Sequence, residues 1–194
     1  MKSGNSKISA LLKSADPNAE VKGAFHNNEM FIGNDHGIFH LDKENQKWIQ
    51  KFDKGQVVDI KNQGDLFVAS TFAGLVISND GGENWKTSGP KKTMTKVIIA
   101  DDAIYGLSMN GGLWESKDYG KTWNNLNSLS EMFVSDISKV KGGILAVTRE
   151  GLSFKPISKA NWEEIELPAN VFFSEIKMIG DKVYAIGYPR GNGC

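Results

Sequence analysis

Short apolar runs alternate with polar, glycine-containing turns along almost the whole chain. The runs are rich in β-branched and aromatic residues and are bounded by turn residues, a pattern typical of β-strands rather than helices. They occur in pairs separated by polar or glycine dipeptides such as Gln63-Gly64, which predicts hairpins. The first strands are expected at 57–60, 96–100, 134–140 and 172–179, and the second strands at 30–32, 66–69, 104–107, 144–147 and 183–186.

One spacing recurs four times. Four glycines each precede a short apolar stretch, and a tryptophan follows each glycine after 11 residues. The glycines are Gly37, Gly74, Gly112 and Gly151, and the tryptophans are Trp48, Trp85, Trp123 and Trp162. The steps between successive glycines are 37, 38 and 39 residues, and a period near forty marks an array of identical units. The third strand is expected to start at the glycine and the fourth at the tryptophan. Four antiparallel strands per unit make one blade of a β-propeller.

The repeat therefore predicts an all-β fold, a β-propeller of four-stranded antiparallel blades of about 38 residues, with four full blades and a partial or composite fifth. A single domain over 1–194 is expected, with an N-terminal strand or arm at 1–19 and four blades within 20–168. The blades are expected at roughly 20–53, 54–90, 91–130 and 131–168, and residues 169–194 would supply the first two strands of a fifth, possibly truncated, blade.

Two interpretations of the chain ends stay open. Gly191 occupies the marker position of a fifth unit three residues before Cys194, and Ile8 to Ser14 precede the first blade as Trp48 to Lys51 precede the second. Either the N-terminal piece completes the fifth blade and closes a ring, which would protect sheet edges, or the chain is the front part of a longer propeller. Residues 1–19 could alternatively form a short helix or be disordered.

Two of the turns between the third and fourth strands share a sharper motif. Residues 78–85 read SNDGGENW and residues 116–123 read SKDYGKTW, and both fit S-x-D-x-G-x-[NT]-W. This motif resembles the Asp-box, or bacterial neuraminidase repeat (BNR), of sialidases, sortilin-type receptors and propeller-type photosystem II assembly factors. In the first unit the serine, aspartate and glycine positions hold Leu41, Lys43 and Asn45, and in the fourth they hold Lys155, Ile157 and Lys159.

The residue types of this motif suit a turn. An aspartate can accept hydrogen bonds from backbone N–H groups two residues on, and glycine takes a positive φ freely, with Asn45 the next most tolerant substitute in the first unit. The tryptophan should pack against a neighbouring blade. One carboxylate per turn is too few for calcium, so a structural role is expected for the motif residues. They are Ser78, Asp80, Gly82, Trp85, Ser116, Asp118, Gly120 and Trp123.

Composition excludes several classes of function. The 23 basic and 23 acidic residues balance without a charged block, which argues against nucleic acid as a partner. No apolar run reaches membrane-spanning length, so membrane insertion is not expected. The lone Cys194 gives neither a disulfide framework nor a thiolate metal cluster, and no cofactor is expected. The apolar stretch Ile8 to Leu12 is too short for a secretory signal, yet Asp-box proteins are often exported, so the compartment is left open.

A sialidase is disfavoured because the resemblance implies three arginines that hold the substrate carboxylate, whereas this chain has only Arg149 and Arg190. Lysine does not replace arginine at a bidentate site. Paired carboxylates would be needed for another glycosidase, and no candidate stands out by spacing. The candidates are Asp35, Asp59, Asp101, Asp102, Glu150 and Glu175. His36 and His40, with Asp35, are a minor metal candidate, because a four-residue step on a strand and loop does not form one metal-binding face. No catalytic residue and no metal site are assigned.

A non-catalytic binding or assembly module is the favoured function, with a glycoside hydrolase of the Asp-box propeller type, or a fragment of one, as the alternative. Loops on one face of a rigid scaffold would contact a protein or glycan partner. The candidate loop residues are Asp35, His36, Phe72, Met109, Asn110, Arg149, Glu150 and Arg190. Phe72, Met109 and Met132 are apolar where turns are normally polar, and they either cap the blade ends or contact the partner. The arginine patch that the resemblance implies for photosystem assembly factors is absent, so their partner is not carried over.

Overall fold

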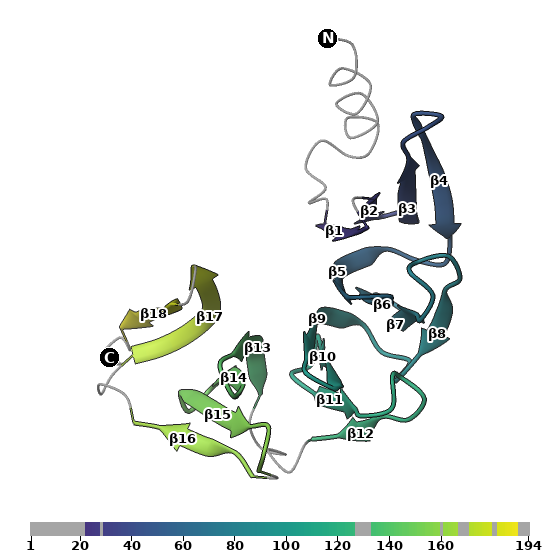
Figure 1. The fold of residues 1–194 in the computed structure, drawn as a ribbon. Helices are drawn as coiled ribbons and strands as arrows, with labels where there is room; N and C mark the ends of the chain where they lie inside the picture. Colours follow the sequence, from purple (N-terminus) through teal and green to yellow (C-terminus); the bar gives the residue numbers. More distant parts are fainter. Residues whose placement is uncertain are drawn as a thin grey trace. The chain divides into compact units, whose positions relative to one another are not determined.

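The computed structural model describes residues 22–27, 29–126, 133–159, 161–166, 171–179 and 182–189. Every regular element within these ranges is a β-strand, and the strands form four four-stranded antiparallel sheets and one two-stranded sheet (Figure 1). The predicted all-β fold of four complete blades and a partial fifth is confirmed. The expectations for residues 1–19 and for 190–194 lie outside the described residues. No helix long and apolar enough to cross a membrane occurs in the described ranges.

Each four-stranded sheet follows the order of its strands in the sequence. The first sheet contains β1 (Lys22–His26), β2 (Glu29–Asn34), β3 (Gly37–Asp42) and β4 (Lys47–Phe52). The second contains β5 (Val57–Gln63), β6 (Leu66–Thr71), β7 (Gly74–Ser78) and β8 (Lys86–Ser88). The third contains β9 (Met94–Ala100), β10 (Ala103–Ser108), β11 (Leu113–Ser116) and β12 (Asn124–Asn125). The fourth contains β13 (Val134–Val140), β14 (Gly143–Thr148), β15 (Leu152–Pro156) and β16 (Glu163–Ile165), and the last contains β17 (Val171–Ile179) and β18 (Lys182–Pro189).

Three of the four marker glycines, Gly37, Gly74 and Gly151, have a positive φ, whereas in the third sheet the positive φ falls on Gly111 and not on Gly112. Gly74 has φ +137, and a Cβ there would lie 2.8 Å from the carbonyl oxygen of Pro90, beyond the end of the fourth strand. Gly37 has φ +123 and an even closer approach to Phe52 O, so only glycine fits at this start of the third strand. The fourth strand differs slightly from the prediction. It begins one residue after the tryptophan in three sheets and one residue before it in the first. At Trp85, the indole N–H donates to Gly82 O and so closes the preceding turn.

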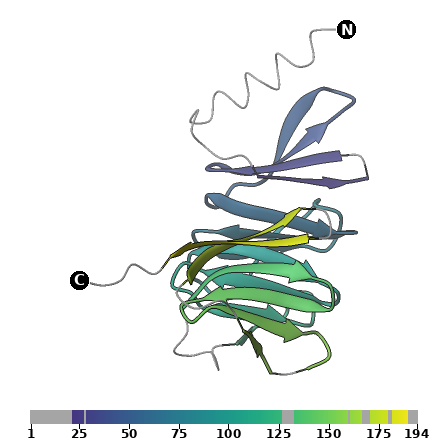
Figure 2. The same cartoon turned by 90° about the vertical axis from the view of Figure 1, so that its left-hand side faces the viewer.

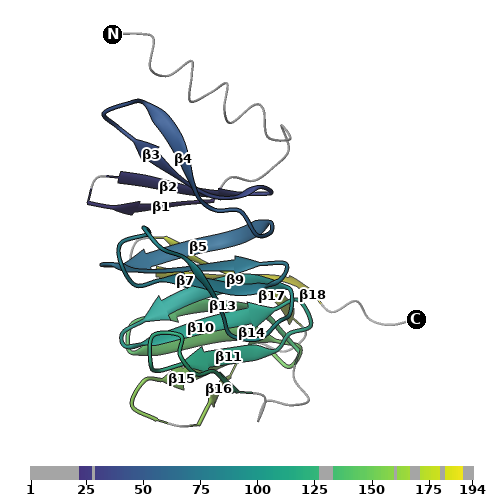
Figure 3. The same cartoon turned by 90° about the vertical axis from the view of Figure 1, so that its right-hand side faces the viewer.

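The chain divides into two compact units, residues 1–94 and 95–194. In the first unit, β1 and β2 contact β5 of the next sheet (Figure 3). Apolar side chains of both sheets form one core between them, against which the partly buried Trp85 packs. Its buried members are Ala24, Phe31, Ile38, Phe52, Val57, Ile60, Phe67, Ala69 and Val76. The prediction that one thin sheet buries its core against a neighbour is thus met within this unit.

The second unit contains three sheets, in which β13 contacts both β10 and β17. One core lies between the third and fourth sheets, with Ile98, Ala100, Ala103, Tyr105, Leu107, Leu113, Val134, Ile137, Ile144 and Ala146. Another joins the fourth sheet to the two-stranded one through Leu145, Val147, Leu152 and Ile176. Figure 2 shows β17 and β18 running side by side, and β17 contacts β13 and β14 of the fourth sheet. The single domain expected over 1–194 stays a prediction.

Candidate functional site

The loops between the second and third strands share an internal support. In the first sheet, the Asn34 Oδ1 accepts a hydrogen bond of 2.8 Å from the backbone N–H of His36. In the second, the Thr71 Oγ1 accepts from Ala73 N at 3.1 Å and donates to Gly74 O at 2.9 Å. A side-chain oxygen at the end of the second strand therefore closes each loop locally.

The second unit repeats this arrangement. The Ser108 Oγ accepts from Gly112 N at 2.9 Å and donates to Gly112 O at 3.1 Å. The Thr148 Oγ1 accepts from the N–H groups of Glu150 and Gly151, both at 3.2 Å, and donates to Gly151 O. Sequence reasoning missed these four supporting residues. The signal was an Asn, Ser or Thr placed three or four residues before each marker glycine.

The supported loops expose the residues that the sequence proposed as a binding site. Asp35, His36, Phe72, Met109, Asn110, Arg149 and Glu150 are all exposed. Each follows directly on a supporting side chain, so a fixed backbone presents it to solvent. Arg190 and Met132 lie outside the described residues, and the binding role of the whole set stays a prediction.

One of these loops lies against an aromatic side chain in the second unit. A Cβ on Gly111 would lie 2.8 Å from the Cδ2 of Phe133, and Val134 N donates to Gly111 O at 3.3 Å. The Cζ of Arg149 lies 5.4 Å from the centroid of the Phe133 ring, within the range of a cation–π contact. Phe133 is 39% exposed and Met109 58% exposed. An aromatic ring, an arginine and a methionine-bearing loop thus form a surface, here called the Phe133 surface (Met109 to Gly111, Phe133 and Arg149).

Sequence reasoning did not select Phe133. It stands immediately before β13, where a first strand begins, and such positions hold different residue types in the other units. Only the contact with the Gly111 backbone and the Arg149 side chain distinguishes Phe133 from an ordinary strand residue.

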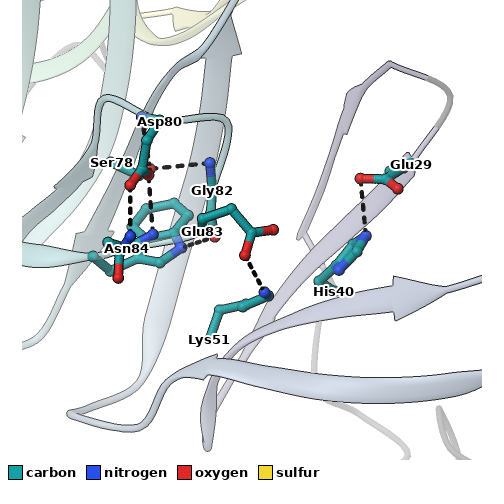
Figure 4. A network of polar contacts seen from close by, with 9 residues as sticks. Glu29, His40, Lys51, Ser78, Asp80, Gly82, Glu83 and Asn84 are labelled. Carbon is teal, nitrogen blue, oxygen red and sulfur yellow. Dashed lines mark hydrogen bonds and ion pairs between the residues drawn. The ribbon is translucent and has the colours of Figure 1, made fainter.

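The Asp-box turn of the second sheet is a closed hydrogen-bond network (Figure 4). The Ser78 Oγ donates to Asp80 Oδ1 at 2.6 Å and accepts from Gly82 N at 3.0 Å. Asp80 accepts from Asn84 twice, from the backbone N–H at 2.9 Å and from Nδ2 at 2.7 Å. The backbone donor therefore lies four residues on rather than the expected two. The Ser78 hydroxyl, followed by the Asn84 donors, lowers the pKa of Asp80 from 3.8 to about 2.

The third sheet carries the same network. The Ser116 Oγ donates to Asp118 Oδ1 at 2.8 Å and accepts from Gly120 N at 2.9 Å. Asp118 accepts from the backbone N–H of Thr122 at 2.8 Å and from its hydroxyl at 2.6 Å. The Thr122 donors contribute most to lowering the pKa of Asp118 to about 2. Gly82 and Gly120 have φ +91 and +80, in the region that favours glycine.

The Asp-box turn of the second sheet also contacts the first sheet. The Trp85 Nε1–H donates to Gly82 O at 2.8 Å, and the Trp85 ring packs edge-on against Phe67 at 5.8 Å. The Glu83 carboxylate forms an ion pair of 2.8 Å with the Lys51 ammonium of β4 (Figure 4). The groups of this turn are therefore engaged within the protein, as a scaffold requires.

The degenerate turn of the first sheet corrects one expectation. Asp42, which the glycine-based alignment passed over, accepts hydrogen bonds from Glu44 N, Asn45 N and Asn45 Nδ2 at 2.9, 3.1 and 2.7 Å. The Asn45 donors lower the pKa of Asp42. The positive φ falls on Gln46, at +53, and not on Asn45, whose backbone and side-chain N–H groups both donate to Asp42. In the fourth sheet the buried Lys155 donates from Nζ to Lys159 O at 3.2 Å.

Three of the carboxylates considered for a glycosidase lie close to a lysine, and a fourth, Asp35, lies close to His36. Asp59 lies 2.6 Å from Lys61 Nζ, Asp101 lies 3.5 Å from Lys139 Nζ, and Glu175 lies 3.6 Å from Lys177 Nζ. A buried carboxylate that the sequence analysis did not select, Asp136, lies 2.6 Å from the Lys96 Nζ.

His36 and His40, which the sequence suggested as a minor metal candidate, differ in exposure and in their partners. His36 is exposed and lies 3.6 Å from Asp35, whereas the buried His40 stacks on Phe31 and lies 3.1 Å from Glu29 (Figure 4). Within the described part of the chain, no group of three or more His, Cys, Asp or Glu residues could hold a metal ion.

Known structures are similar to this chain in fold. YCF48 from Cyanidioschyzon merolae gives a TM-score of 0.61 at 12% identity, with 86% of this chain and 63% of that chain covered. A structure of YCF48 bound to D1 peptide gives 0.68 at 17% identity, with 90% and 65% covered. An ancestral GH74 enzyme gives 0.66 at 15% identity, with 88% and 27% covered. The chain spans less than two thirds of the length of these proteins.

Such low identities show the fold alone, which is that of a β-propeller. No model of a known protein family matches the chain, and no curated protein matches it in sequence.

Proposed function

We propose that this chain is a non-catalytic binding or assembly module that holds a protein partner through the loops between its second and third strands. The observation that carries the proposal is the Phe133 surface. There, the exposed Met109 and Arg149 lie on loops whose backbones are closed by Ser108 and Thr148, and Phe133, immediately before β13, lies beside them.

The chemistry of this surface suits a protein rather than a glycan. Aromatic and arginine side chains dominate the binding energy of protein interfaces, and methionine adapts to irregular apolar partners. The guanidinium of Arg149 lies over the Phe133 ring, and the planar fork of an arginine matches the geometry of a carboxylate. Fixed loops also reduce the ordering cost of association.

The comparisons with known structures support the proposed protein-binding function but do not identify a partner. YCF48, which shares the fold, is described bound to D1 peptide, so a propeller of this kind can hold a peptide. At 17% identity its binding residues are not carried over to this chain.

Glycoside hydrolysis is the rival function, because an ancestral GH74 enzyme also shares the fold. It would need a pair of carboxylates, one acting as acid and one as base or nucleophile. Glu150 is the candidate nearest the Phe133 surface, since it follows Arg149 in the same exposed loop.

Capture of proteins from cells that express this chain tests the proposal. The immobilised wild type is compared with Phe133→Ser and with the control Tyr119→Ser, which changes an exposed aromatic residue of the Asp-box turn in the third sheet. We expect one set of proteins retained by the wild type and the control and lost with Phe133→Ser. Hydrolysis of sialyl or β-glucan substrates that is lost in Glu150→Gln would instead support the rival function.

A further inference from the structure

Met109 carries an exposed thioether on a loop whose backbone is fixed without it. The residue is 58% exposed and stands first in the loop that follows Ser108. The carbonyl oxygen of Ser108 accepts a hydrogen bond of 2.9 Å from Gly111 N, and the Ser108 Oγ accepts one of 2.9 Å from Gly112 N. Because these bonds use only backbone groups and the Ser108 hydroxyl, a chemical change at the Met109 sulfur leaves them in place.

The other methionines within the described ranges are less exposed. Met94 is fully buried, Met30 is half-buried, and Met178 on β17 is 40% exposed. Met109 is therefore the most exposed of these methionines to a small reagent in solution. Met132 and Met1 lie outside the described residues.

An exposed thioether reacts with hydroperoxides. The sulfur lone pair forms a bond to one peroxide oxygen, the O–O bond breaks, and the proton of the transferred oxygen moves to the departing one. The sulfur is oxidised by two electrons to a sulfoxide, while hydrogen peroxide is reduced to water. Methionine sulfoxide reductases reverse the change, with thiols as the source of electrons.

A sulfoxide would change the Phe133 surface at its methionine. The thioether of methionine is apolar and flexible and adapts to irregular apolar partners. The sulfoxide is polar, and covering its oxygen without a hydrogen-bond donor is unfavourable. Oxidation of Met109 should therefore weaken the contact with a partner that covers this side chain.

We propose that Met109 is a site of reversible oxidation by hydroperoxides and that its sulfoxide form releases the partner from the Phe133 surface. The effect on binding rests on the proposed function, whereas the site of oxidation does not. Since the sulfur supports none of the hydrogen bonds that close the loop, oxidation changes the surface and not the fold. The modification is thus a switch, in contrast to oxidation of the fully buried Met94, which would disrupt packing.

Peptide mapping by mass spectrometry tests the site of oxidation. The purified full chain is treated with hydrogen peroxide and sampled over time. We expect the sulfoxide to form at Met109 about tenfold faster than at the buried Met94, and also faster than at Met30 and Met178. The far-UV circular dichroism spectrum should stay unchanged while Met109 reacts. Equal rates at Met109 and Met94, or a loss of the β-sheet spectrum in step with oxidation of Met109, would overturn the proposal.

Capture from a cell extract tests the effect on binding. The readout is the amount of those proteins that the wild type retains and Phe133→Ser loses. After removal of the peroxide, the oxidised wild type should retain about tenfold less, in step with its Met109 sulfoxide content. Treatment with methionine sulfoxide reductase and dithiothreitol should restore retention. Met109→Leu, compared with its own untreated sample, should not respond to peroxide, whereas the control Met178→Leu should respond as the wild type does.

The outcomes separate this proposal from the proposed function. Retention that survives full oxidation of Met109, or that the reductase does not restore, would overturn the switch, as would an equal response of Met109→Leu and the wild type. If Phe133→Ser loses nothing that the untreated wild type retains, the proposed function fails and the switch fails with it. The oxidation map still decides in that case whether Met109 is the site of oxidation.

Discussion

Gly82, in the turn between β7 and β8, lies directly against the ring of Phe31 in the neighbouring sheet. A Cβ on Gly82 would overlap the Cε1 of Phe31, and the residue has φ +91. The bare backbone of the Asp-box turn is therefore a packing surface for the adjacent sheet. The glycine of the motif serves both the turn and the contact between sheets within this unit.

Gly82→Ala should destabilise the protein more than a positive φ alone explains. The substitution adds a backbone penalty of about 1–2 kcal/mol and an overpacking cost of about 1–3 kcal/mol at Phe31. Gly142→Ala is the matched control, because Gly142 has φ +83 and nothing within 4 Å of its Cβ position. Urea unfolding of both variants measures the difference, and equal losses would show that Phe31 moves aside freely.

Trp85→Ala should lower the free energy of unfolding by about 3–5 kcal/mol, because the indole packs on Phe67 and fills the core of the first unit. Trp85→Phe should lose less, since it keeps one aromatic ring in the core and gives up the second ring of the indole and the Nε1 hydrogen bond to Gly82 O. Chemical denaturation measures the free energy of unfolding of both variants. A Phe variant as unstable as the Ala variant would assign the main role to the hydrogen bond.

Acid stability should depend on Asp80. Its pKa is about 2 in the folded protein against an ordinary 3.8, so the folded state binds the proton less readily than the unfolded chain. Its stabilising contribution is complete above 3.8 and is lost as the pH falls toward 2. Urea midpoints measured across this range should fall less steeply for Asp80→Asn than for the wild type. Identical slopes would contradict the hydrogen-bond network around Asp80.

Asp136 should contribute strongly to the stability of the second unit. Its Oδ1 accepts from Lys96 Nζ at 2.6 Å and from Ile137 N at 2.9 Å, and its Oδ2 accepts from Ile176 N of β17 at 2.7 Å. Asp136→Ala leaves three donors unpaired, one of them charged, at a cost of about 3–5 kcal/mol. Lys96→Met should cost less, because both backbone donors keep their acceptor. Thermal unfolding of the two variants shows which loses more stability. A larger loss for Lys96→Met than for Asp136→Ala would contradict the role given to Asp136.

The fold could be predicted because the packing requirement recurs. Gly74 and Trp85 recur at a fixed interval because the same local structure recurs. The marker glycine has a positive φ in three of the four complete sheets, and the rings of Trp85 and Trp162 pack against apolar cores. Asp42 could not be predicted from that interval. Its turn closes by a different hydrogen-bond pattern and places the positive φ on Gln46.

The candidate site could be predicted only in part. Loop positions such as Met109 follow from the repeat. The residues that close the loops, such as Asn34 and Ser108, differ in type, although each accepts a hydrogen bond from a backbone N–H of its loop. Phe133 gives no signal in the sequence, because its contacts with the Gly111 backbone and with Arg149 come from loops distant along the chain.

The central claim, that Asp-box turns are scaffold and the loops are the binding site, is tested most directly by one affinity measurement. A partner retained by the wild type but not by Phe133→Ser is titrated against the wild type, Asp80→Ala and Phe133→Ser, with unfolding free energies measured on the same samples. Asp80→Ala should keep the wild-type Kd while losing about 1–3 kcal/mol of stability. Phe133→Ser should keep most of its stability and weaken the Kd by about tenfold or more. An Asp80→Ala protein that is fully stable yet no longer binds would contradict the account.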